Sequence, residues 1–476
     1  MNAPRSTPDH ARLALGYAIA IGLSLVAGAS LALGLGMQPL AGRGAGADAE
    51  GFRRLYSMHG LVMVFLVALP GIPGVLGNWM LPRDLGVAQM ALPRLNRLAF
   101  QLFVGGCALF LVALCCAPAD AGWSFELPFA LASQARLSWS LVAMAVLVVA
   151  SVCSSINLLV TVAARQRWSE LSPLAWSLAL SSLVQILAAP LFFVALTLVF
   201  AERAGAADIL SAAPAGDVRF TAWFWSWGHP ALGATLIAAL GIVAEIVARH
   251  TRGPRSASRA EVTSLLAIAV LSFAAAGVHV LGRGTTESEA SGTSALSLAL
   301  GLPFALILAG TTRELSRGAL RASPALGYAL VFLVLLCVGG MAGVFLSLSP
   351  TAAQLRETCF GAAQFHYLAA GGALAALFAG LYQVWPRWFG VRVHEGWGLA
   401  GCALFFVGIN LTFFPRFVLG YLGQPRRSTQ ILAGGENLGT LSAIGCALLL
   451  VALVIVGWNL LSSLLQPRTE TQEEPA

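Results

Sequence analysis

Four histidines in apolar surroundings are the residues of this chain best suited to metal chemistry. They are His59, His229, His279 and His366. A neutral imidazole nitrogen is a common ligand for transition metals. An ionisable side chain inside a long apolar segment is costly to bury, so such residues usually have a functional role. The four positions therefore predict a site for a metal or a metal-bearing prosthetic group.

The depth of these histidines along their apolar segments is the second observation. At a rise of about 1.5 Å per residue in an α-helix, all four fall within roughly the outer 15 Å of a membrane. Prosthetic groups bound at one depth of the membrane by the four imidazoles would explain this common position. Histidines that only pack between helices, each bonded to a carbonyl group, would explain it as well. Depth alone leaves both interpretations open.

The elements that must hold these residues are membrane-spanning helices. Hydrophobic residues make up 58% of the chain and charged residues 10%, with a mean hydropathy of +0.80, which excludes an ordinary water-soluble protein. The sequence predicts an all-α, polytopic membrane protein, with one membrane domain over residues 1–465 and a disordered cytoplasmic tail over residues 466–476. Twelve runs reach the length of about 20 apolar residues that a span needs: 11–36, 55–81, 97–117, 137–163, 172–201, 220–249, 262–282, 294–312, 324–348, 357–386, 397–418 and 437–464.

The basic residues indicate how these helices are oriented. All 28 of them are arginine, because the chain contains no lysine. Positively charged loops are retained on the cytoplasmic side, and the arginines are more numerous in the loops on the side of the N-terminus. We therefore expect an integral protein of a bacterial inner membrane with both termini in the cytoplasm. The net charge of +7 favours contact with lipid headgroups, and the scattered arginines predict no nucleic-acid binding.

Three motifs carry a resemblance to a known family. Residues 358–367 read T-C-F-G-A-A-Q-F-H-Y, residues 55–82 contain M-H-G within a glycine-rich helix, and residues 413–427 read F-F-P-R-F-V-L-G-Y-L-G-Q-P-R-R. They resemble the tenth helix, the second helix and the segment between the last two helices of heme-copper oxidase subunit I, as in cytochrome c oxidase subunit I. The resemblance implies the twelve-transmembrane-helix fold of that family.

The same resemblance implies a ligand set for one heme. His59 and His366 match the two axial ligands of the family's low-spin heme, which is of type a or b. Two imidazole ligands leave no open position on the iron, so such a heme carries electrons and binds no substrate. Arg426 and Arg427 match the family's arginines that bind the heme propionates, and the predicted topology puts them on the same side as the histidines.

The motifs of the family's oxygen-reducing site are incomplete in this chain. His229, in W-S-W-G-H-P, matches one copper ligand, but Gly233 stands at the place of the family's redox tyrosine. Val278 and His279 stand where the family has two adjacent histidine ligands of copper. Gln364 replaces the histidine that holds the second, high-spin heme. The resemblance therefore implies a degenerate site that lacks a complete set of ligands for copper and for a second heme.

The family's usual proton routes are interrupted as well. Gln89 stands where many members have an acid, and Ile307 lies near the place of their channel lysine. Glu245 is the one carboxylate that the sequence predicts inside a helix. Protons do not cross the apolar part of a membrane without polar groups or water, so proton pumping is not expected. At the outer mouth, Glu357 is a candidate metal ligand.

Three functions are compatible with the sequence. The first is respiratory electron transfer through a bis-histidine heme in a divergent subunit I whose oxygen site is inactive. The second is an active terminal oxidase, with cytochrome c or a quinol as electron donor, or a nitric-oxide-metabolising relative with altered ligands. The third is a heme-free structural or transport subunit. The first two imply subunit II-like and III-like partners and an electron-donating protein, and they leave open whether the chain is itself an oxidoreductase.

Overall fold

A computed structural model shows that the chain is built of helices. The α-helices are α1 (Asp9–Met37), α2 (Ala49–Leu61), α3 (Asn78–Asp84), α4 (Pro93–Cys116), α5 (Phe129–Ala132), α6 (Ser138–Ala163), α7 (Pro173–Arg203), α8 (Gly216–Thr251), α9 (Arg259–Ala274), α10 (Glu287–Leu315), α11 (Pro324–Ser347), α12 (Ser349–Leu355), α13 (Cys359–His366), α14 (Leu374–Phe389), α15 (Glu395–Tyr421) and α16 (Glu436–Ser463). Further helical segments are η2 (Val62–Ala68), η3 (Gly71–Gly77), η4 (Trp168–Glu170), η5 (Ala275–Val280) and η6 (Tyr367–Ala373). The structure describes residues 9–38, 49–125, 127–133, 135–165, 167–206, 210–211, 216–251, 253, 255–280, 286–318 and 320–467.

Twelve helices of the described chain are long and apolar enough to span a membrane, so the predicted all-α fold class is confirmed. The second span joins α2 to α3, and the tenth joins α13 to α14. The predicted ends differ most at α10, which begins at Glu287 and not at 294. Thr286 and Glu289 form a capping box there, so a polar first turn precedes the apolar run. Of the predicted tail, residues 468–476 lie outside the described residues.

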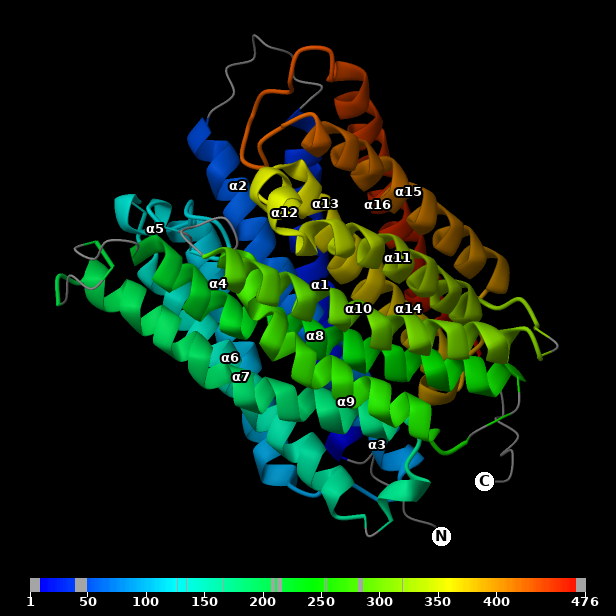
Figure 1. The fold of residues 1–476 in the computed structure, drawn as a ribbon. Helices are drawn as coiled ribbons and strands as arrows, with labels where there is room; N and C mark the ends of the chain where they lie inside the picture. Colours follow the sequence, from blue (N-terminus) through cyan, green and yellow to red (C-terminus); the bar gives the residue numbers. More distant parts are fainter. Residues whose placement is uncertain are drawn as a thin grey trace, which may run out of the picture.

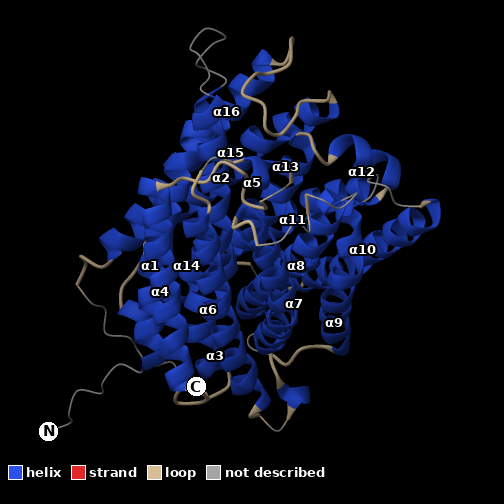
Figure 2. Ribbon diagram, turned by 90° about the vertical axis from the view of Figure 1, so that its left-hand side faces the viewer, coloured by secondary structure: helices blue, strands red, loops and turns tan. Residues whose placement is uncertain are grey.

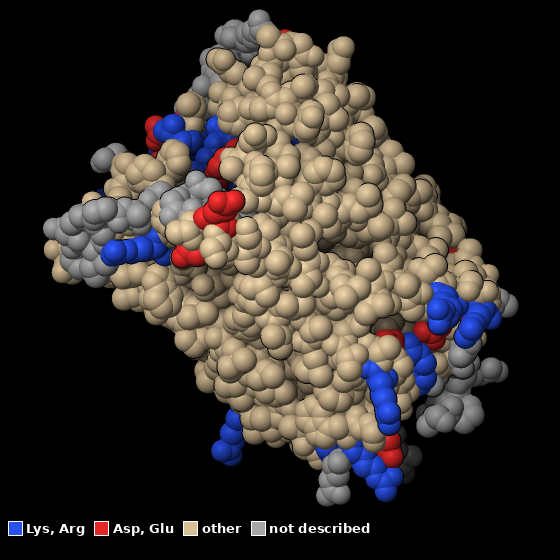
Figure 3. All heavy atoms as spheres, in the orientation of Figure 1, with Lys and Arg blue, Asp and Glu red and all other residues tan. Residues whose placement is uncertain are grey.

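The helices run between two ends of the bundle that differ in content (Figure 1). The start of α1 and the end of α16 lie at one end, whereas the start of α2, α5 and α12 lie at the other, an arrangement that the turned view also shows (Figure 2). On the face drawn in Figure 3, charged side chains gather toward the ends and a broad uncharged belt lies between them. A belt of this kind fits the apolar interior of a bilayer.

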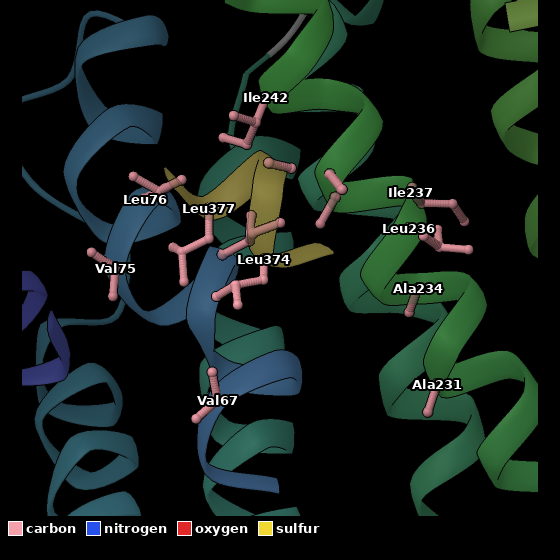
Figure 4. Close-up of a cluster of buried hydrophobic side chains, with 14 of the residues drawn as sticks. Val67, Val75, Leu76, Ala231, Ala234, Leu236, Ile237, Ile242, Leu374 and Leu377 are labelled. Carbon is pink, nitrogen blue, oxygen red and sulfur yellow. The ribbon is translucent and has the colours of Figure 1, made fainter. Parts of the chain in front are cut away.

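The centre of the bundle is formed by the second, sixth and tenth spans. Leu76 of η3, Ile242 of α8 and Leu377 of α14 converge there (Figure 4), and all three side chains are buried. A Cβ atom at Gly380 would collide with Leu76 and lie 3.2 Å from Ile242. Glycine at this position therefore lets the three helices approach closely, which fixes the spacing of the elements that carry the candidate site.

The two helices that carry the predicted heme ligands share a change of helical type. His59 lies near the end of α2, and the wider π-helical turn of η2 begins at Val62. His366 is the last residue of α13, and the π-helical segment η6 begins at Tyr367. A π-helical turn contains more residues than an α-helical turn and often occurs at functional sites. The sequence analysis did not predict these turns.

The packing of α16 against α15 should depend on Gly445. A Cβ atom there would lie 2.6 Å from the backbone carbon of Leu411, which cannot move aside as a side chain can. We expect Gly445→Ala to cost about 1–3 kcal/mol through overpacking, measured as earlier thermal unfolding in detergent. Gly457→Ala is the matched control in the same helix, because nothing lies within 4 Å of its added methyl group. Equal stability of the two variants would contradict this packing.

Candidate functional site

His59 and His366 face each other across the bundle. Their ring centroids are 6.2 Å apart, and the ring planes differ by only 7°. Both side chains line one continuous cavity of about 810 Å³. The fold therefore brings together the two residues that the sequence predicts as axial ligands, although they are far apart along the chain.

Hydrogen bonds fix the orientation of both rings. Nδ1 of His59 lies 3.0 Å from the carbonyl oxygen of Gly28, and Nδ1 of His366 lies 2.7 Å from that of Ala362. A carbonyl group can only accept, so each Nδ1 carries a proton and donates it. Each Nε2 then keeps the lone pair that a metal ligand needs. The carbonyl contact expected of a packing histidine is thus present, and it is compatible with a ligand role.

Arg416 is a residue of this site that the sequence analysis did not single out. Phe413 of α15 packs against the ring of His366, with centroids 4.3 Å apart. Arg416 follows one turn later on the same side of the helix and lines the same cavity. Its Nε donates to Ser442 Oγ at 2.9 Å, and that hydroxyl donates to the carbonyl of Thr412 at 2.9 Å. No carboxylate in the described part of the chain pairs with this arginine.

The two arginines predicted to bind propionates occupy different surroundings. Arg426 lines the cavity and forms an ion pair of 2.7 Å with the carboxylate of Glu357. The guanidinium of Arg427 lies over the ring of Phe129, 4.6 Å from its centroid, and Arg427 is not part of the cavity lining. Glu357, the candidate metal ligand, therefore already has a cationic partner, and Arg426 is the better placed of the two arginines.

The second histidine pair lies elsewhere along the same cavity. The rings of His229 and His279 are 5.3 Å apart and nearly perpendicular, at 79°. Trp225 stacks on His279 at 3.7 Å, and Nη1 of Arg356 lies 3.4 Å from Nδ1 of His279. A guanidinium beside an imidazole opposes the binding of a further cation through Coulomb repulsion. Nδ1 of His229 is buried without a hydrogen-bond partner.

The other positions that the sequence analysis assigned to the oxygen-reducing site carry an apolar side chain, a glycine and an amide. Val278 is buried and packs against Ala352. A Cβ atom at Gly233 would lie 2.9 Å from the Cβ of Ser272, so α9 leaves little room for a tyrosine there. Gln364 lines the cavity. Among the described residues, no group of three or more His, Cys, Asp and Glu side chains could hold a metal ion.

Trp123 connects the two histidine pairs, and sequence reasoning missed it because it lies in a loop without a motif. Its ring packs 5.4 Å from that of Phe365 and 5.7 Å from that of Trp225. A Cβ atom at Gly60, next to His59, would lie 2.8 Å from Trp123. The glycine of the M-H-G motif therefore has a packing role, because it lets the indole approach the helix that carries the first ligand.

Two polar contacts and one apolar residue occupy positions that the sequence analysis considered for proton transfer. Glu245 is buried in α8 and forms an ion pair of 2.7 Å with Arg249, close to the C-terminal end of that helix. Asn96 donates to the amide oxygen of Asn78 at 2.6 Å. Ile307, which the resemblance put near the place of a channel lysine, is buried. These contacts give each polar side chain a structural partner.

Comparison with known proteins identifies the family of the chain. Residues 12–468 match the family described as cytochrome C and quinol oxidase polypeptide I. The chain belongs to this family. Quinol oxidase subunit 1 of Bacillus subtilis is 26% identical over 469 residues, which cover 96% of this chain and 72% of the relative. Cytochrome c oxidase subunit 1 of Thermostichus vulcanus is 28% identical over 425 residues, which cover 87% of this chain and 77% of the relative.

A solved structure supports the same fold. A heme-copper terminal oxidase dimer, solved by cryo-EM, has a TM-score of 0.84 to this chain, covering 98% of it and 85% of that chain at 16% identity. At this identity the likeness establishes the fold. Family membership implies heme cofactors and other oxidase subunits as partners. With its apolar helices and bacterial relatives, the chain is an integral membrane protein of this family.

The geometry of the second histidine pair predicts weak copper binding. Protein produced with copper in the medium should contain well below one copper per chain, measured by mass spectrometry of the metals. Val278→His adds a third imidazole but leaves Arg356 in place. The double variant with Val278→His and Arg356→Ala should therefore hold more copper than Val278→His alone. One copper per chain in the unaltered protein would contradict this reasoning.

Proposed function

We propose that the chain binds one low-spin heme, of type a or b, between His59 and His366 and uses it for respiratory electron transfer. The parallel pair of imidazoles carries this proposal. Two metal–nitrogen bonds of about 2 Å each, together with the half-widths of two five-membered rings, add up to roughly 6 Å. The ring centroids are 6.2 Å apart. The residues present therefore fit one six-coordinate iron.

When bound, such a heme supplies one-electron chemistry and offers no open position to a substrate. The chain's own residues hold and tune it. Phe413 packs against His366 and restricts the rotation of its ring. Arg426 offers paired donors to a carboxylate, as propionate binding requires. Arg416 adds a positive charge on the same side of α15 as Phe413, and Arg427 remains a less direct candidate for a propionate contact.

The helices α2 and α13, which carry His59 and His366, lie toward the end of the bundle opposite to the start of α1 and the end of α16 (Figure 1). Together with the distribution of arginines, this favours cytoplasmic termini in a bacterial inner membrane and a heme near the outer surface. We propose that electrons reach it from an electron-donating protein or a subunit II-like partner that docks at the outer mouth beside Glu357 and Arg426. A subunit III-like partner is a further expectation from the family.

We also propose that this chain does not reduce oxygen. The support is the second histidine pair, where Arg356 lies beside His279, Val278 replaces a third imidazole and Gly233 leaves little room for a tyrosine. Gln364 offers an amide, a weaker iron ligand than imidazole. The paired state of Glu245 and the apolar Ile307 also favour a chain without the usual proton supply.

The heme assignment is tested by replacing each ligand. His59→Ala and His366→Ala should each abolish the low-spin heme spectrum, because the iron loses one of its two axial bonds. Optical and electron paramagnetic resonance spectra of the purified variants provide the measurement. His250→Ala is the matched control, since this histidine bonds Ser323 at the inner end of α8. An unchanged low-spin spectrum in both ligand variants would refute the assignment.

Arg416 should raise the midpoint potential of the heme. A nearby cation stabilises the ferrous state, which carries one positive charge less than the ferric state. We expect Arg416→Leu to lower the midpoint by about 59 mV, a tenfold change for a one-electron couple. Spectroelectrochemical titration measures this shift. Arg416→Lys should shift less, and Arg313→Leu, an exposed position in α10, should not shift it. A higher midpoint in Arg416→Leu would refute the charge effect.

The loss of oxygen chemistry is tested with carbon monoxide and oxygen. Carbon monoxide binds ferrous heme only where a coordination position is open, so the reduced protein should bind well below one molecule per chain. Oxygen consumption with a chemical electron donor should be close to the background rate. Carbon monoxide binding at one per chain together with rapid oxygen consumption would show instead that the site works with substitute ligands.

A further inference from the structure

Arg416 brings a positive charge into the cavity near the two proposed heme ligands. It lies in α15, within the eleventh span, and its side chain lines the cavity. Phe413, one turn earlier in α15, packs against the ring of His366. The charge of Arg416 acts on the imidazoles of both His59 and His366. The guanidinium therefore lies within electrostatic reach of the space where the heme is proposed.

In the described part of the chain, one nitrogen atom of this guanidinium has a hydrogen-bond partner. Nε donates to the hydroxyl of Ser442, which donates in turn to the carbonyl oxygen of Thr412. No hydrogen bond or ion pair with a described residue engages the two Nη groups. The bond to Ser442 orients the planar group, and both Nη groups keep their donors for a ligand. Paired N–H donors of this kind match the two oxygen atoms of a carboxylate.

The residues that line the cavity carry more positive than negative charge. Among the described ones, the arginines are Arg356, Arg416 and Arg426, whereas Glu357 is the one acidic residue. The carboxylate of Glu357 already forms an ion pair with Arg426. A cation without an anionic partner is costly in an apolar region. The cavity therefore favours a ligand that carries negative charge.

Arg427 packs against aromatic rings and a loop. Its guanidinium lies 4.6 Å from the centroid of the Phe129 ring and 5.8 Å from that of the Tyr56 ring. A Cβ atom at Gly122 would lie 2.7 Å from its Nη2, so the loop before α5 also confines it. Arg427 does not line the cavity, whereas Arg416 does. Of these two arginines, Arg416 is therefore the one placed to meet a ligand.

We propose that Arg416 binds a carboxylate in the cavity and that this carboxylate is a propionate of the heme. The inference rests on the heme proposed above. Arg426, which also lines the cavity, would hold the other propionate. The family resemblance implies Arg426 and Arg427 for these contacts, so in this chain Arg416 takes the role of Arg427. A fatty acid from the membrane is the other source of a carboxylate, and the test separates the two sources.

The test compares two hemes that differ only in their carboxylates. The full chain, prepared without heme in lipid nanodiscs, is titrated with protoheme and with protoheme dimethyl ester, whose propionates carry no charge. The absorbance of the low-spin heme gives the Kd of each. Arg416→Gln should raise the Kd for protoheme about ten- to hundredfold, as loss of a hydrogen bond to a charged group predicts. The Kd for the ester should stay unchanged, because the ester offers no carboxylate to Arg416.

Three further variants define the contact. Arg416→Lys keeps the charge without the paired donors, so it should raise the Kd for protoheme less than Arg416→Gln does. Arg427→Gln should also have a smaller effect than Arg416→Gln. Arg136→Gln is the matched control and should leave both Kd values unchanged, because Arg136 is exposed and does not line the cavity. Size-exclusion chromatography shows whether each variant is folded.

Three results would overturn this contact alone. Equal increases of the two Kd values in Arg416→Gln would show a structural role. An increase for protoheme in Arg427→Gln without one in Arg416→Gln would restore the assignment that the family resemblance implies. One fatty acid per heme-loaded chain, measured by mass spectrometry and lost in Arg416→Gln, would make a fatty acid the ligand. Low-spin heme in these cases leaves the heme assignment intact, whereas its absence from the unaltered chain would refute both.

Discussion

The high cost of an unpaired polar group in the apolar interior of a membrane governs the arrangement of this protein. His59 and His366 avoid this cost because Nδ1 of each ring donates a hydrogen bond to a carbonyl oxygen, that of Gly28 for His59 and that of Ala362 for His366. Those two hydrogen bonds select the tautomer with an available Nε2 and hold the rings nearly parallel. The need to pair buried polar groups therefore accounts for a ring geometry that is compatible with the axial ligation proposed above.

The histidines of the second pair have different surroundings. His279 is stacked on Trp225 and lies beside the guanidinium of Arg356, whereas Nδ1 of His229 has no partner. A positive charge therefore lies beside one of the histidines that the family resemblance assigns to copper. The two parts of one cavity thus have different chemistry. One holds two parallel imidazoles whose Nδ1 atoms are bonded to carbonyl groups, and the other holds an arginine beside a histidine and a buried nitrogen atom without a partner.

The distance between neighbouring helices determines which side chains fit at each site. Gly60 lets Trp123 approach the helix of His59, so the glycine supports the first site. Gly233 lets α9 approach α8 so closely that Ser272 occupies the neighbouring space. The chain therefore has no tyrosine at this position and little room for one. The effect of each glycine follows from the element that lies opposite to it.

The sequence by itself determined the twelve spans, the all-α fold and the family, because long apolar runs and motifs such as M-H-G are local signals. It also predicted His59 and His366 as a pair, and an arginine inside the run 397–418 was a local signal for Arg416 that the analysis did not use. Only the tertiary structure decided the 6.2 Å spacing of the rings, the π-helical turns and the separate surroundings of Arg426 and Arg427. These depend on contacts between helices distant in the chain, which no local pattern records.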